Sequence, residues 1–309
     1  MNCGHIIEQL LAERANLNLG KIGVEIECLL RRDLFNSDEL NKILYATRFM
    51  NSTDSSIEQT PGTKDQRYVK FETNNYVPEF YVDLMPQLAK LLGWMKRSIT
   101  PDQLARYKGS DPYYRDYKEW YSKNSHWPNC KIPTNPSAGT HIHFDIKGWF
   151  SDRDHAERFA HAFNTHGNTF KQMVPRARYA TPGKGGNFYA QFNPVQPKTQ
   201  RGAQTSTTAT AYFGSVAQDR RSALNCTAAM RRGDIEFRFI NATLNYNTID
   251  NWIKVLAELI EASRQDQHHD FMGYLDKENP ESAEFVRQKQ AAMAKSTEDP
   301  NFEWPEKQV

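Results

Sequence analysis

The sequence predicts an α+β fold, in which a curved and mainly antiparallel sheet carries a polar site on its concave face and helices on its convex face. Three short segments alternate ionisable and apolar side chains at every second position, and three longer segments carry apolar side chains at helical spacing. Because successive side chains of a strand point to opposite faces, each alternating segment has one polar and one apolar face. The apolar faces and the amphipathic helices would bury one another in a single core.

The three alternating segments span residues 23–27, 139–146 and 235–239. Their polar positions hold carboxylates, imidazoles and a guanidinium, whereas a solvated sheet face would favour Lys, Thr and Ser. These side chains are Glu25, Glu27, His141, His143, Asp145, Glu236 and Arg238. Carboxylates and imidazoles are groups that hold divalent cations. We therefore predict a metal-binding concavity.

Each segment also has a purely structural interpretation. Glu25 and Glu27 could charge an exposed edge strand against aggregation, and Glu236 with Arg238 could belong to a ladder of ion pairs. The two histidines at i and i+2 are more specific, because side chains at that spacing point the same way with Cβ atoms about 6–7 Å apart. The shared polarity of all three segments favours the site.

The same two periodicities predict the other elements. Helical spacing predicts helices over residues 5–15, 82–99, 152–170 and 248–264, with a helix or turn over 37–49. Alternation predicts strands over residues 22–30, 67–72, 222–229 and 233–241. We expect those helices near 84–98, 152–170 and 248–264 to cover the convex face.

The composition of two stretches predicts irregular structure rather than a helix or strand. Residues 100–138 are rich in Tyr and Trp and form an expected insertion, whose aromatic side chains either seal the core edge or cover a ligand. Residues 180–216 are rich in Gly, Thr, Gln and Asn and predict a loop, in which Gly183-Lys184-Gly185 lacks the spacing of a phosphate-binding loop. We expect one domain over residues 1–276 and a charged tail over 277–309 that holds one helix, 281–295.

Composition narrows the class of protein. The 309 residues are 39% hydrophobic and 25% charged, which is typical of globular proteins. No apolar run approaches the roughly 20 residues of a membrane helix, and the N-terminus lacks the features of a signal peptide, so we expect a cytoplasmic protein. A net charge of +2 with dispersed Arg pairs does not indicate nucleic acid. The pairs at 31–32, 220–221 and 231–232 could instead line an anionic substrate site.

Four motifs resemble, in order and spacing, the amidoligase family, a branch of the glutamine synthetase-like carboxylate-amine ligases. They are Gly-x-Glu-x-Glu at 23–27, Gly-Thr-His-Ile-His-Phe-Asp at 139–145, Arg221-x-x-x-Asn225, and Ile-Glu-Phe-Arg at 235–238. The resemblance covers about residues 20–262. It implies a fold similar to the catalytic domain of glutamine synthetase.

The resemblance also implies roles for individual residues. The implied metal ligands are Glu25, Glu27, Glu72, His141 and Glu236. His141 would bind metal near the nucleotide phosphates together with Arg221 and Asn225, and His143 would face the substrate. Arg238, Arg221 and Arg178 would clamp the transferring group, and Asp54 belongs to a segment similar to the family's Asp-x-Ser.

Two assignments stay open. The residues after Glu72 depart from the family pattern, so Glu79 is an alternative to Glu72 as the further metal ligand. The base that removes the amine proton is Asp54, Asp145 or Glu79.

The activity that the resemblance implies is ATP-dependent amide formation through an acyl phosphate, with Mg²⁺ as the cation and Mn²⁺ as its alternative. The expected partners are a small-molecule or peptide carboxylate and an amine, with no membrane and with the oligomeric state left open. Two alternatives belong to other classes: a phosphotransferase of the guanidino-kinase type, and a non-catalytic scaffold that binds nucleotide or metal.

Overall fold

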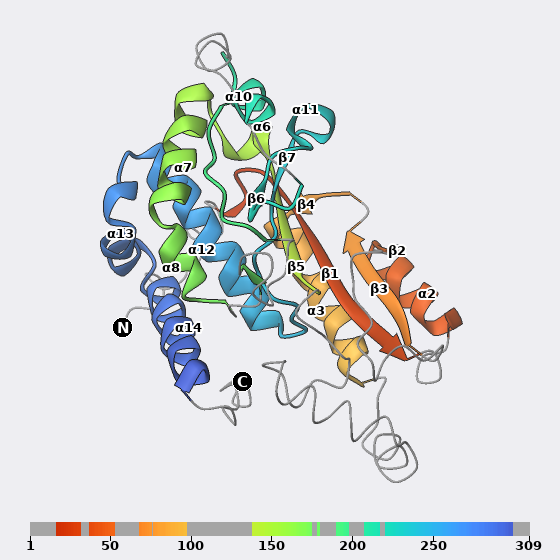
Figure 1. Cartoon of the computed structure of the whole chain (residues 1–309). Helices are drawn as coiled ribbons and strands as arrows, with labels where there is room; N and C mark the ends of the chain where they lie inside the picture. Colours follow the sequence, from red (N-terminus) through yellow and green to blue (C-terminus); the bar gives the residue numbers. More distant parts are fainter. Residues whose placement is uncertain are drawn as a thin grey trace, which may run out of the picture.

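The computed structural model describes residues 17–31, 37–52, 68–75, 77–97, 138–174, 178–179, 190–197, 207–216 and 220–298 (Figure 1). The predicted helix over 5–15, nearly all of the Tyr-rich insertion and Asp54 lie outside these residues.

A seven-stranded sheet organises the described part of the chain. Its order is β2-β3-β1-β5-β7-β6, with β4 also beside β1, and the paired strands are antiparallel. The strands are β1 (Lys21–Arg31), β2 (Phe49–Ser52), β3 (Tyr68–Asn75), β4 (Glu79–Phe80), β5 (Thr140–Asp145), β6 (Leu224–Asn225) and β7 (Asp234–Phe237). The predicted α+β class with a mainly antiparallel sheet is confirmed.

Alternation along the central strands decides which face of the sheet is buried. Val24 and Ile26 of β1, Ile142 of β5 and Phe237 of β7 are fully buried on one face. Each buried Val, Ile or Phe side chain contributes about 1.5–3 kcal/mol relative to leaving it exposed. Shifting one strand by a single residue would turn its carboxylates or imidazoles into this core, so the hydrophobic pattern fixes the register.

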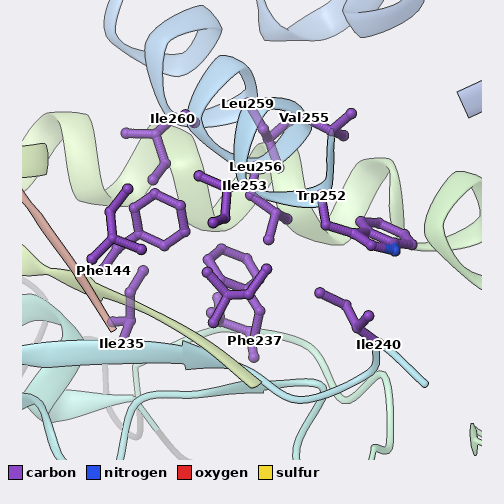
Figure 2. Close-up of a cluster of buried hydrophobic side chains, with 14 of the residues drawn as sticks. Phe144, Ile235, Phe237, Ile240, Trp252, Ile253, Val255, Leu256, Leu259 and Ile260 are labelled. Carbon is purple, nitrogen blue, oxygen red and sulfur yellow. The ribbon is translucent and has the colours of Figure 1, made fainter. Parts of the chain in front are cut away.

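Three amphipathic helices cover the apolar face: α3 (Tyr81–Arg97), α7 (Arg153–Thr165) and α12 (Tyr246–Arg264). Figure 1 shows α7 beside α12, and the two helices are in contact. Figure 2 shows the core between strand and helix, where Phe144 and Phe237 face Ile253 and Leu256 of α12. The helices expected near 84–98, 152–170 and 248–264 are therefore present, and they lie on one face of the sheet.

The predicted helix over 152–170 is two helices. Asp152 caps α7 by accepting a hydrogen bond from the backbone of His155 at 2.8 Å. The helix ends at Thr165 with His166 as its C-cap, and a separate short helix, α8 (Gly167–Lys171), follows it.

Short elements replace or interrupt several predicted segments. Part of the predicted loop over 180–216 is the helix α10 (Ala209–Ser215), capped by Thr208, because Tyr212 and Phe213 are buried against α7. The predicted strands over 222–229 and 233–241 shorten to β6 and β7, with α11 (Ala229–Arg232) between them. In the sequence, the helix α2 (Ser37–Ala46) precedes β2, which is an edge strand of the sheet.

The C-terminal helices pack on the same core. They are the 3₁₀ helix η4 (His268–Asp270), α13 (Phe271–Glu278) and α14 (Pro280–Glu298). The Phe285 ring of α14 lies 5.7 Å from the Trp252 ring of α12. The boundary expected at 277 thus falls within α13, and α14 shares the main core. In the part of the chain described here, no helix is both long and apolar enough to cross a membrane.

Candidate functional site

Strand register brings the predicted polar side chains onto the face opposite the core. Directly paired residues of neighbouring strands share a face. The pairs are Glu27 with Glu72, Glu25 with His141, His143 with Glu236, and Glu236 with Asn225. Side chains from five strands therefore meet on one surface, as the alternating segments predict.

His141 lies at the centre of this group and contacts carboxylates from two strands. Its Nδ1 is 2.8 Å from Glu25 Oε1 and 3.1 Å from Glu236 Oε1, and its Nε2 is 3.7 Å from Glu27 Oε2. The ring is only 1% exposed. Three carboxylates thus converge on a single buried imidazole.

His143 forms the second centre, next to the first. Its Nδ1 lies 3.0 Å from Asp234 Oδ2, and its Nε2 lies 3.7 Å from Glu25 Oε2 and 4.0 Å from Glu236 Oε1. Asp234 also lies 3.3 Å from the Nε of Arg232. Glu25 is therefore shared between the two histidines.

The buried charges strongly shift one another's pKa values. Burial by itself would raise the pKa of Glu25 and of Glu236, but His141 and His143 hold the pKa of Glu25 well below its ordinary value and lower that of Glu236 to about 2. Burial would lower the pKa of both histidines. The neighbouring carboxylates outweigh this effect and raise the pKa of His141 to about 9 and that of His143 to about 10. Without a metal, protonated imidazoles therefore balance the carboxylates at neutral pH.

Hydrogen bonds fix the orientation of the carboxylates. Arg238 Nη1 donates to Glu236 Oε1, and Asn225 Nδ2 donates to Glu236 Oε2 at 2.7 Å. The amide of Asn225 is oriented in turn, because its oxygen accepts from the backbone and hydroxyl of Thr227 at 3.0 and 2.7 Å. The backbone of Gly139 donates to Glu27 Oε2. These contacts hold the carboxylate oxygens in place, as the outer hydrogen-bond partners of metal sites do.

Two sets of side chains have the geometry of cation sites. Glu25, Glu27 and His141 each offer a ligand atom within 4.8 Å of the others, and so do Glu25, His143 and Glu236. Glu72 belongs to neither set, although it lies opposite Glu27 and lines the adjoining cavity.

An open cavity of about 480 Å³ lies over this acidic floor. Its lining residues are Glu25, Glu72, His143, Arg220, Asn225, Thr227, Ala228, Arg231, Arg232, Glu236 and Arg238. Glu27 and His141 lie beneath the floor, where each is about 1% exposed. Carboxylates and guanidinium groups thus face the same space, which is the arrangement needed to bind an anion together with a cation.

Two of the predicted arginines lie elsewhere. Arg178 is buried beneath the site, where its guanidinium donates to the carbonyl oxygens of Ala138, at 3.0 Å, and Arg238, and burial lowers its pKa to about 10. Arg221 does not line the cavity, whereas the neighbouring Arg220 does. The spacing to Asn225 favoured Arg221, but a turn rather than a strand presents these side chains, so spacing does not determine which one points inward.

Two of the three residues predicted as a base, Asp145 and Glu79, are not in the cavity lining either. Asp145 accepts hydrogen bonds from the backbones of Lys21 and Gly148, at 3.0 Å for Gly148, and so caps the short helix α6 (Ile146–Trp149). Glu79 contacts Arg48 at 2.8 Å and the side chain of Gln87. Between the alternative metal ligands, Glu72 lines the cavity and Glu79 does not. Asp54 lies outside the described residues.

Asp234 and Thr227 are site residues that the sequence analysis missed. Asp234 continues the alternation of Glu236 and Arg238 toward the start of β7, so extending that pattern by one step would have found it. Thr227 orients the Asn225 amide and also lines the cavity, but it leaves no comparable signal in the sequence. Arg231 and Arg232 form one of the pairs expected near an anion, and both line the cavity.

Comparison with known proteins supports the resemblance. The model of a family described as "putative amidoligase enzyme" matches residues 129–260, which contain β5, β6, β7, α7 and most of α12. The similarity to the amidoligases is confirmed over this segment. Glu25, Glu27 and Glu72 lie outside the match and join the site through the sheet register. A search of curated proteins found no match to the chain.

Proposed function

We propose that this chain is an ATP- and Mg²⁺-dependent carboxylate-amine ligase that forms an amide bond through an acyl phosphate. The observation that carries the proposal is the convergence of Glu25, Glu236, His143 and Arg238 on one cavity from separate strands. The match of residues 129–260 to an amidoligase family supports the class of reaction.

The side chains present suit divalent cations. Glu25 and Glu236 are ionised at neutral pH, because their pKa values are lowered. Carboxylate oxygens are the ligands that Mg²⁺ prefers, and the added imidazoles suit Mn²⁺ as the alternative. Glu25, Glu27 and His141 would hold one ion, and Glu25, His143 and Glu236 a second. Such ions, when bound, neutralise phosphate oxygens and align the reacting groups.

The reaction that this site would perform has two steps. A carboxylate oxygen of the substrate attacks the γ-phosphorus of ATP, forms a new O–P bond and releases ADP. The amine nitrogen then attacks the carbonyl carbon of the acyl phosphate, inorganic phosphate leaves, and the amine gives up a proton. Phosphoryl transfer of this kind depends on positioning and charge stabilisation more than on covalent help from the protein.

The arginines around the cavity provide charge stabilisation from the chain itself. Arg238 is fixed on the floor by Glu236, whereas Arg220 and Arg231 are exposed at the rim. Guanidinium groups bind phosphate oxygens in pairs of charge-assisted hydrogen bonds. Asp145 and Glu79 already have partners away from the cavity, so Asp54 remains the candidate for the base that accepts the amine proton.

Product analysis tests this proposal against its alternatives. The protein is incubated with ATP, Mg²⁺ and pools of carboxylates and amines, and the mixture is searched for a new mass. A ligase yields a product equal to the two substrates minus water, with one ADP and one phosphate per product. A stable phosphorylated product would instead identify a phosphotransferase, and nucleotide binding without turnover would identify a scaffold protein.

A pair of variants links the activity to the site. Glu236→Ala removes a carboxylate from the floor, so we expect product formation to fall at least about 100-fold. Asp154→Ala changes an exposed carboxylate on α7, away from the cavity, and should leave the rate unchanged. Equal rates for the two variants would contradict the proposed site.

A further inference from the structure

Three histidines meet on the helical side of the sheet, away from the cavity. His161 belongs to α7, and His268 and His269 belong to η4. Each offers a ring nitrogen within 4.8 Å of the others. The ring centroids of His268 and His269 are 4.2 Å apart, and His161 lies 5.8 and 6.1 Å from them. The proposed ligase reaction uses none of these residues.

His268 is the member of this cluster that points to a ligand. Its side chain is 2% exposed, yet neither ring nitrogen has a hydrogen-bond partner among the described residues. Leaving a buried polar group unsatisfied costs about 1–3 kcal/mol, so native structures rarely do it. The carboxylate of Asp266 lies close by, with its Oδ1 3.7 Å from His268 Nδ1.

The backbone around the cluster is held firmly. His166 Nε2 donates to the carbonyl oxygen of His268 at 2.6 Å, which ties η4 to the end of α7. Asp270 caps α13 through the backbone of Gly273 at 3.0 Å. His161 and His269 are exposed, so their rings can turn without disturbing the core. Zn–N bonds of about 2.0–2.1 Å place tetrahedral ligands about 3.4 Å apart, so ring nitrogens that lie within 4.8 Å of one another need to move closer by about 1.4 Å at most.

We propose that His161, His268 and His269 form a Zn²⁺ site, with the carboxylate of Asp266 within reach of the fourth position. Imidazole nitrogens favour zinc over Mg²⁺, whereas the carboxylate-rich floor of the cavity favours Mg²⁺. The two sites therefore select different ions. Zinc bound here would link α7 to η4 and stabilise the C-terminal helices against unfolding.

Zinc titration in excess Mg²⁺ tests the site, because Mg²⁺ occupies the carboxylates but competes poorly for three imidazoles. Untagged, chelator-treated protein is compared with the double variant His161→Ala/His269→Ala and with Asp154→Ala as the matched control on α7. The wild type and Asp154→Ala should bind one more equivalent of zinc than the double variant. With Co²⁺ in place of zinc, the absorption bands of a tetrahedral site should appear only in the first two proteins.

A second variant distinguishes the loss of a zinc ligand from a folding defect. His269→Gln removes one exposed ligand and should weaken zinc binding at least about tenfold while the metal-free melting temperature stays unchanged. Zinc should also raise the melting temperature of the wild type but not that of the double variant. Equal zinc content in the wild type and the double variant, or no zinc bound by the wild type in excess Mg²⁺, would overturn the proposal. Neither result depends on whether the chain is a ligase.

Discussion

In the proposed function, His141 and His143 would couple cation binding to protonation. Their pKa values of about 9 and 10 mean that both rings are protonated at neutral pH in the metal-free protein. A cation that takes the lone pair of either ring must displace a proton. Affinity for Mn²⁺ or Mg²⁺ should therefore rise as the pH is raised toward 9.

Calorimetry measures the released protons directly. Mn²⁺ is titrated at pH 7.5 in two buffers that differ in ionisation enthalpy, and the difference in observed heat gives the number of protons released. We expect about one proton for each histidine that becomes a ligand. Heats that do not depend on the buffer would show that neither ring ligates the ion.

The same pKa values set how metal-free stability depends on pH. The folded-state pKa of each histidine lies above its ordinary value of 6.5, so the charged form stabilises the fold. This contribution is complete below about pH 6.5 and is lost as the pH rises through 9 to 10. The metal-free protein should therefore melt at progressively lower temperatures across that alkaline range, and a melting temperature that stays constant there would contradict the charge balance.

Gly139 is required by the close packing beneath the site. A Cβ atom added there would lie 2.6 Å from Arg178 Nη2 and 2.7 Å from His141 Nε2, and both side chains are buried. We expect Gly139→Ala to destabilise the protein by about 1–3 kcal/mol and to weaken cation binding. Gly167→Ala is the control, because its nearest atom would be Phe192 Cδ1 at 3.6 Å. Denaturant unfolding that does not distinguish the two variants would contradict this packing.

Elements with a long periodic pattern could be predicted, and short ones could not. The alternation in β1, β5 and β7 and the apolar stripe of α12 each recur often enough to identify the element from sequence. In contrast, β6 has two residues and α11 has four, so neither can show a period. Their conformations depend on partners, such as β7 beside β6, that are distant in sequence or known only from the fold.

The C-terminal helix α14 gives a test of how far the core extends. Its charged composition suggested a tail, but the Phe285 side chain is buried against Trp252. We expect Phe285→Ala to cost about 3–5 kcal/mol of unfolding free energy, measured by denaturant titration. Gln288→Ala, at an exposed position of the same helix, should change stability by less than about 0.5 kcal/mol. Similar changes in unfolding free energy for the two variants would show that α14 is not part of the core.

Across the whole molecule, the floor of the site was predictable residue by residue, whereas for the rim the sequence indicated only which arginine pairs could line an anion site. Strand alternation alone assigns Glu25, His143 and Glu236 to one face. Side chains of a strand alternate between its two faces, so once the apolar side chains are placed in the core, the polar ones must lie on the opposite face. Arg220 and Arg231 reach the cavity from a turn and a short helix, whose direction follows from packing. The family match covers residues 129–260, so the sheet register is what places Glu25 and Glu27 beside His141.

The most direct measurement is calorimetric titration of ATP, with and without Mg²⁺, into the wild type and the variants Glu25→Ala and Glu236→Ala. Because cation and phosphate would be bound together above the same carboxylates, we expect the wild type to bind ATP only when Mg²⁺ is present. Both variants should stay folded and lose at least about tenfold in affinity. Unchanged Mg²⁺-dependent ATP affinity in both folded variants would contradict a site built on these residues.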